Sequence, residues 1–191
     1  MKKFFSILLA LLLCLCTVMP AQASTPSFSW NSMEFCAAFN PILYNFIEES
    51  ATWKSPDANT RIGTFTNSPI IEIFSKNGKV TAISMTTTIS AIDEDDSYKK
   101  SEGLWLAMIT GCACAAILND FDVLSDMDVQ EQLYEQIGNL YDNAFYKLDS
   151  LKFTDINIET ITFCNIDITC TSFYFGWNNP LTVNIILKPA Q

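Results

Sequence analysis

Two glutamates in predicted strands, Glu72 and Glu159, are the residues whose chemistry could support catalysis. Glu159 alternates with Ile161 and Phe163, so its side chain is expected to point into the same apolar layer. A carboxyl group buried in such a layer has a raised pKa and can act as a general acid or base. Two of them about 5 to 10 Å apart would suit glycoside hydrolysis.

The orientation of Glu72 depends on a hairpin. Asn77-Gly78 separates two β-prone runs, residues 70–75 and 79–92, and Asn-Gly is the strongest short-range hairpin signal. A two-residue turn there places Glu72 opposite Ile83, on the apolar face. The alternative is a slipped register or a two-sided sheet, in which Ile71 faces the core and Glu72 faces water.

The sequence contains no histidine. The absence of histidine excludes catalysis by Ser-His or Cys-His pairs, histidine-containing zinc sites and histidine pH switches. Carboxylate, lysine or tyrosine catalysis is still open, but no recognisable catalytic motif is present.

Five cysteines follow the first 23 residues, an odd number that leaves at least one thiol unpaired within the chain. Cys112 and Cys114 lie two apart in an apolar helix, where burial as small hydrophobic side chains is favoured over metal binding or redox exchange. The predicted disulfide joins a helix to a strand, pairing Cys112 or Cys114 with Cys164 or Cys170. The fifth cysteine is Cys36.

An aromatic run, residues 173–177, leads from a predicted strand into a turn. A helix-covered sheet often leaves a pocket between its layers. The predicted lining of that pocket is Glu72, Met85, Tyr174 and Trp177.

Two acidic stretches could attract a cation. Residues 93–96 are predicted to be a solvated loop, and residues 120–131 match a calcium loop poorly, because Leu124 and Ser125 replace a ligand and the turn glycine. The sequence therefore predicts no metal and no cofactor.

The elements that position these residues give an α+β pattern. Residues 101–120 are apolar on every side, which predicts a buried central helix. Residues 126–149 form an amphipathic helix, and residues 31–47 a helix interrupted at Pro41. We expect an antiparallel sheet, made of the Asn-Gly hairpin and three C-terminal strands within residues 152–187, covered by two to three helices.

Residues 1–23 have the basic start, apolar middle and Ala-x-Ala end of a secretory signal peptide. Residues 24–191 then form one exported domain, periplasmic or extracellular, with no membrane insertion after cleavage. The formal net charge of −10 argues against nucleic-acid binding.

Together these features predict a non-catalytic exported domain that binds a protein, peptide or small apolar ligand. One alternative is a carboxylate-dependent hydrolase acting on a substrate such as glycan. Another is a secreted inhibitor or secretion accessory protein that works through its surface.

Overall fold

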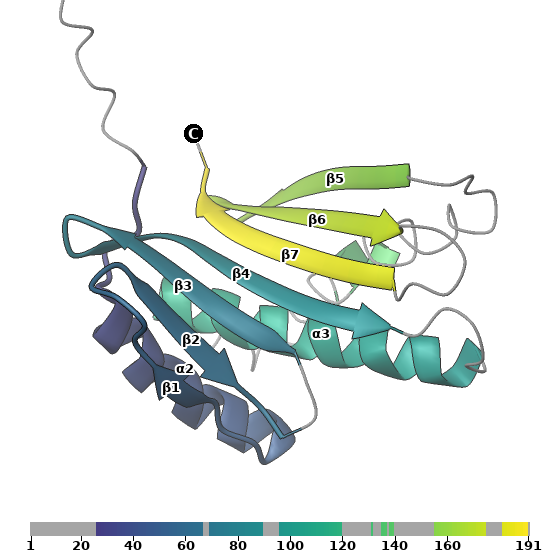
Figure 1. The fold of residues 1–191 in the computed structure, drawn as a ribbon, viewed down its shortest axis with the longest axis horizontal. Coiled ribbons are helices and arrows are strands. Elements are labelled where there is room, and N and C mark those ends of the chain that lie inside the picture. The colour runs from purple at the N-terminus through teal and green to yellow at the C-terminus, as the bar shows by residue number, and fades with distance from the viewer. Residues whose placement is uncertain are drawn as a thin grey trace, which may run out of the picture.

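The computed structural model describes residues 26–66, 69–89, 96–119, 155–174 and 181–190, together with residues 131, 135, 136, 138 and 139. Its strands form a seven-stranded antiparallel sheet in the order β1-β2-β3-β4-β7-β6-β5 (Figure 1). The strands are β1 (Thr52–Lys54), β2 (Thr60–Thr64), β3 (Ile70–Lys76), β4 (Lys79–Ile89), β5 (Asp155–Phe163), β6 (Ile166–Tyr174) and β7 (Leu181–Pro189).

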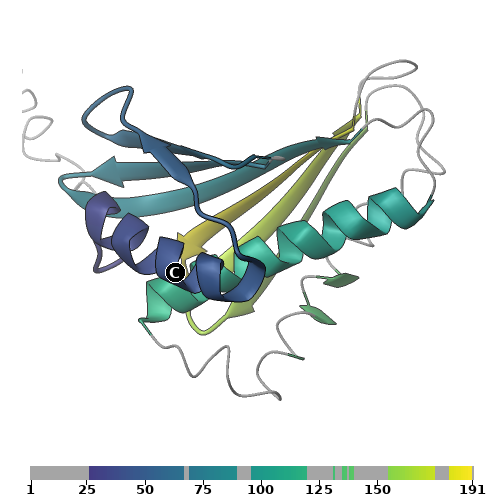
Figure 2. The same ribbon diagram turned by 90° about the horizontal axis from the view of Figure 1, so that it is seen from below.

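Two helices, α2 (Ser32–Ile47) and α3 (Asp96–Leu118), lie on the same side of this sheet (Figure 2). We call this side the helix-facing side and the opposite one the outer face. The core fills the space between the helices and the sheet, because the fully buried side chains of β3, β4, β6 and β7 alternate with more exposed ones.

Helix α2 begins where the sequence supplies a capping box. The Asn31 side chain accepts hydrogen bonds from the backbone N–H groups of Met33 and Glu34, and the Glu34 carboxylate accepts one from the Asn31 N–H at 2.8 Å. A break after Asn40 was predicted, but α2 continues through Pro41 as one helix. Pro41 is exposed, and the buried Phe39 and Ile42 on either side anchor both halves in the same core.

Replacing Asn31 with alanine is expected to lower the free energy of unfolding by about 1 kcal/mol, because two N–H groups at the start of α2 lose their acceptor. Urea unfolding of the variant measures this difference. Asn45→Ala is the matched control, since Asn45 is exposed inside the same helix and alanine is the better helix former. Equal stability of the two variants would contradict a capping role for Asn31.

Helix α3 is the buried central helix that the apolar run predicts. From Leu106 to Ile117 every residue except Met108 is buried, and α3 packs against both α2 and β4. Thr110 is accommodated because its hydroxyl donates to the Leu106 carbonyl oxygen at 2.7 Å. The helix starts at Asp96, earlier than predicted. Among the described residues, no helix combines the length and apolarity needed to cross a membrane.

The sequence from Glu48 to Ser68, with its two Ser-Pro steps, predicts mostly loop and a short edge strand at residues 62–66. The structure instead places two strands here, β1 and β2, and the sheet edge is β1. Asn40 of α2 holds β1 in place: its amide Nδ2 donates to the Ala51 carbonyl, and its Oδ1 accepts from the Trp53 indole at 3.2 Å. A three-residue strand is too short to show alternation in the sequence.

The Asn77-Gly78 hairpin is confirmed, with positive φ at both turn residues as a type I′ turn requires. Its predicted register is wrong. Glu72 pairs with Ser84 rather than Ile83, because the register shifts by one residue between Phe74 and Ser75. The alternative, with Glu72 away from the core, therefore holds.

The predicted α+β class and antiparallel sheet are confirmed, but the predicted inventory of strands and helices is incomplete. The sheet has seven strands rather than five, and α2 and α3 cover it. Most of the predicted helix at residues 126–149 lies outside the described residues. The few described within it are helical.

Candidate functional site

The two faces of the sheet separate the residues that the predicted pocket was meant to combine. Glu72 shares the outer face with its partner Ser84, whereas Met85 pairs with Ile71 on the helix-facing side. Met85 is fully buried, and the Thr110 hydroxyl lies 3.8 Å from its sulfur. The structure therefore does not bring Glu72 and Met85 together in one cavity.

The other two predicted lining residues lie at the edge of what the structure describes. Tyr174 is the last residue of β6, where only its backbone is described, and Trp177 falls outside the described residues. Their role in ligand contact stays a prediction.

The predicted carboxylate pair is not assembled either. Glu159 is half-buried on the helix-facing side of β5, as its alternation with Ile161 and Phe163 predicts, and its register partner is the buried Cys170. Glu72 projects from the outer face of β3, four strands away in the sheet order. At about 4.8 Å per strand the two are separated by roughly 19 Å. That exceeds the spacing at which two carboxylates act on one glycosidic bond.

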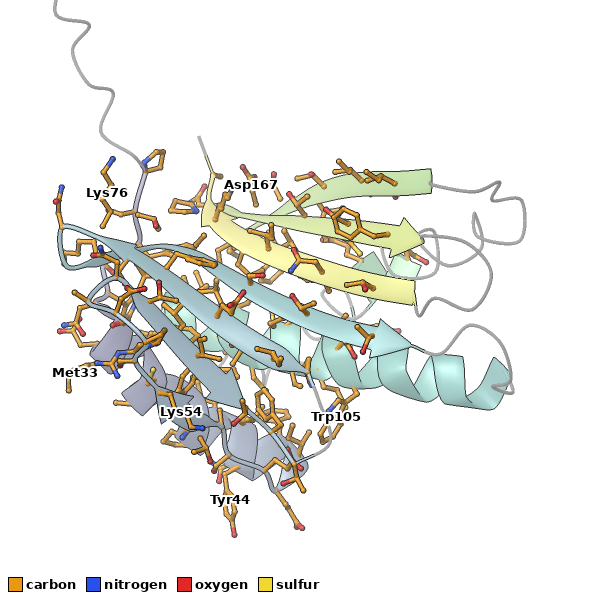
Figure 3. All side chains as sticks on the ribbon, viewed as in Figure 1. Met33, Tyr44, Lys54, Lys76, Trp105 and Asp167 are labelled. Carbon is orange, nitrogen blue, oxygen red and sulfur yellow. The ribbon has the colours of Figure 1, made fainter. Side chains whose placement is uncertain are left out.

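The outer face of the sheet is built largely from hydroxyl-bearing and β-branched side chains. On β5, β6 and β7 its only charged residues are Asp167 and Lys188, which are register partners. Asp167 lies at the hairpin end of β6 (Figure 3). The outer-face residues of these three strands are Ile156, Ile158, Thr160, Thr162, Asp167, Thr169, Thr171, Phe173, Thr182, Asn184, Ile186 and Lys188.

Cross-strand hydrogen bonds fix many of these polar side chains. The Asn184 amide donates to the hydroxyls of Ser84 and Thr86, each at 2.7 Å. The hydroxyls of Thr160 and Thr169 lie 3.0 Å apart. Such pairs stabilise adjacent strands and restrict the rotamers of the groups involved. The outer face of β5, β6 and β7 thus carries few charges, and several of its polar side chains are held by cross-strand hydrogen bonds.

Two isoleucines stand out at the border of this face. Ile156 and Ile158 are 60% and 63% exposed, and they lie on β5, the strand at one edge of the sheet. In the described part of the chain β5 pairs only with β6, so its second backbone edge has no strand partner there. A strand from another chain can pair with an exposed apolar edge strand. We call Ile156, Ile158 and the backbone of β5 the β5 edge.

The sequence contains a pattern that indicates the exposed isoleucines of the β5 edge. The alternation that points Glu159, Ile161 and Phe163 toward the helices also points Ile156 and Ile158 the other way. What the sequence lacks is the sheet order, which makes β5 an edge strand. A second group of exposed apolar side chains, Met33 and Tyr44, projects from α2 away from the sheet (Figure 3).

The five cysteines after residue 23 are all free thiols in the structure. The helix-to-strand disulfide stays a prediction. Burial raises the pKa of Cys112, Cys114 and Cys170 to about 12, and that of Cys36 to about 11. The Cys164 side chain is exposed in the β5–β6 turn. The buried cysteines are therefore thiols rather than thiolates at neutral pH, which disfavours them as nucleophiles or metal ligands.

No group of three or more cysteine or carboxylate side chains able to hold a metal ion occurs in the described parts of the chain. The acidic stretch at residues 120–131 lies almost entirely outside those parts. Comparison of the chain with protein-family models, with curated proteins and with solved structures finds no match.

Proposed function

We propose that this chain is an exported, non-catalytic interaction domain that binds a protein or peptide partner at the β5 edge. The observation that carries the proposal is the exposure of Ile156 and Ile158 on an edge strand. Transfer of an isoleucine side chain from water into an interface contributes about 1.5–3 kcal/mol. Two such side chains on the last strand of the described sheet are what an added strand from a partner would use.

Charge and surface composition support the same proposal. The outer face beside β5 is nearly uncharged, so its contact with a partner would leave few unpaired charges buried. The formal net charge of −10 favours a partner segment with basic residues through long-range attraction. Export is inferred from residues 1–23, which have the pattern of a secretory signal peptide. Their removal would make the net charge of the remaining chain more negative.

The alternative functions gain less support from the geometry. A glycan hydrolase would need Glu72 and Glu159 in one site, and they project from opposite faces. A small-ligand pocket between the layers would need Met85 accessible, and it is fully buried. A secreted inhibitor or accessory protein is a special case of binding through a surface, so the β5 edge would serve it equally.

The test compares Ile156→Ser/Ile158→Ser with the full chain as an affinity bait in envelope and culture fractions of the source cell. We expect at least one protein that the unaltered chain retains and the variant loses, with affinity reduced at least about a hundredfold by the loss of the two apolar contacts. Quantitative mass spectrometry of the eluates measures this.

The matched control is Thr160→Ser/Thr162→Ser, which alters the same exposed strand and keeps both hydroxyl groups. It should retain the partner. If the isoleucine variant and the unaltered chain retain the same proteins, or if neither enriches any, the proposed function is wrong.

A further inference from the structure

The β5–β6 turn, which carries Cys164, lies at the end of the sheet where β7 finishes. The backbone N–H of Ala190, just after β7, donates to the carbonyl oxygen of Asn165 at 2.9 Å. Both Cys164 and Asn165 have positive φ, so the chain reverses within these two residues. The position of Cys164 is thus fixed by a tight turn tied to the adjacent strand end.

The last turns of α3, which carry Cys114, reach the same end of the sheet. The Trp30 indole donates to the Ile117 carbonyl of α3 at 2.8 Å, and the Trp30 carbonyl accepts from the N–H of Val80 at the start of β4. Strand β4 begins beside the end of β7, since Ile83 pairs with Leu187. Figures 1 and 2 agree with this, because in both views the β5–β6 turn and the C-terminal end of α3 lie at one end of the molecule.

The side chains around the turn pack into the core that holds Cys114. Phe163 and Ile166, on either side of the turn, are buried in the same apolar cluster as Cys114. Burial raises the pKa of Cys114, and the charge of a Cys164 thiolate raises it further. Cys114 and Cys164 thus lie at the same end of the sheet, Cys114 buried in the core and Cys164 exposed to solvent.

The remaining cysteines are placed less well to bond Cys164. Cys170 lies six residues further along, about 20 Å away on an extended strand, which is beyond disulfide reach. Cys112 projects roughly 200° around α3 from Cys114. Cys36 lies on α2, and Arg61 of β2 is the charged group that acts on it.

We propose that Cys114 and Cys164 are the cysteines that form an intramolecular disulfide when the protein meets a disulfide oxidant outside the cell. The Cys164 thiolate attacks a low-molecular-weight disulfide such as oxidised glutathione, giving a mixed disulfide and one reduced thiolate. The Cys114 thiol then loses its proton and attacks the Cys164 sulfur, expelling the second reduced thiolate. Two protein thiols are oxidised and one oxidant disulfide is reduced to two thiols.

The burial of Cys114 sets the rate of this reaction. Burial is the largest cause that raises the pKa of Cys114, to about 12 in the reduced chain. It still acts once Cys164 is in the mixed disulfide, so the reactive thiolate is a small fraction at neutral pH. The second step should therefore accelerate close to tenfold per pH unit between pH 7 and 9. The disulfide shares with the proposed function only the export of the chain and needs no partner, so failure to bind a partner leaves it standing.

The purified full chain is reduced, incubated with millimolar oxidised glutathione, denatured, alkylated and digested for mass spectrometry. We expect two fewer alkylated cysteines than in the reduced chain and a peptide pair joined through Cys114 and Cys164. Cys164→Ser and Cys114→Ser should each abolish that pair. Cys112→Ser, which changes a cysteine on the same helix, should leave it in place.

Three results would overturn the proposal: all cysteines remain alkylatable after oxidation, the bond maps to another pair, or Cys112→Ser abolishes it. Circular dichroism of each variant shows whether it is folded. If Cys114→Ser does not fold, the disulfide is still mapped in the unaltered chain, and its loss is tested in Cys164→Ser. The side chain of Cys164 is exposed.

Discussion

Replacing Phe39 with alanine is expected to lower the free energy of unfolding by about 3–5 kcal/mol, a large part of the stability of a domain this size. Phe39 is fully buried in α2. Its ring stacks on Phe35 with centroids 5.4 Å apart and meets the edge of Trp53 at 6.1 Å. The substitution removes these ring contacts and leaves a cavity where α2 meets β1.

Urea unfolding followed by circular dichroism measures the loss. Phe46→Ala is the matched control, because Phe46 lies on the same helix but its side chain is exposed. It should change stability by less than about 1 kcal/mol. A similar effect of both substitutions would contradict the packing of α2 against the β1–β2 end of the sheet.

Oxidation of Cys114 and Cys164 is expected to stabilise the domain by about 4 kcal/mol, because the bond closes a loop of about 50 residues in the unfolded chain. Any strain in the folded state reduces this gain. The measurement is the urea midpoint of the chain before and after treatment with oxidised glutathione. Cys164→Ser, treated identically, controls for other oxidation and should show no shift. An unchanged midpoint in a chain shown to carry the bond would contradict the stabilisation.

The parts of the fold that sequence predicts well are those with strong local signals. Asn77-Gly78 permits positive φ at both positions, which few residue pairs do, so the hairpin follows from two residues. The run from Leu106 to Ile117 has no polar face that could be exposed to solvent, so the burial of α3 follows from its composition.

The features missed by sequence analysis depend on pairing between strands. The bulge beside Phe74 shifts the register by one residue, and one residue is enough to move Glu72 from one face to the other. Strand β1 is three residues long and is held by the Asn40 side chain from α2, a contact that no local pattern encodes.

The same limit applies to the candidate site. Alternation assigns Glu159 to the helix-facing side and, by the same logic, assigns Ile156 and Ile158 to the outer face. It does not say whether that face is covered or whether β5 has a neighbour on each side. The sheet order is needed to show that Ile156 and Ile158 lie on an edge strand, where their exposed side chains form an apolar edge.

Photo-crosslinking at position 158 in the source cell tests the central claim, partner binding at the β5 edge, most directly. A benzophenone amino acid in place of Ile158 reacts only with groups that lie against it. The same group in place of Asp57, which is exposed in the β1–β2 loop, provides the control. We predict a discrete crosslinked species from position 158 that is absent from position 57. No species from position 158, or the same species from both positions, would contradict binding at this edge.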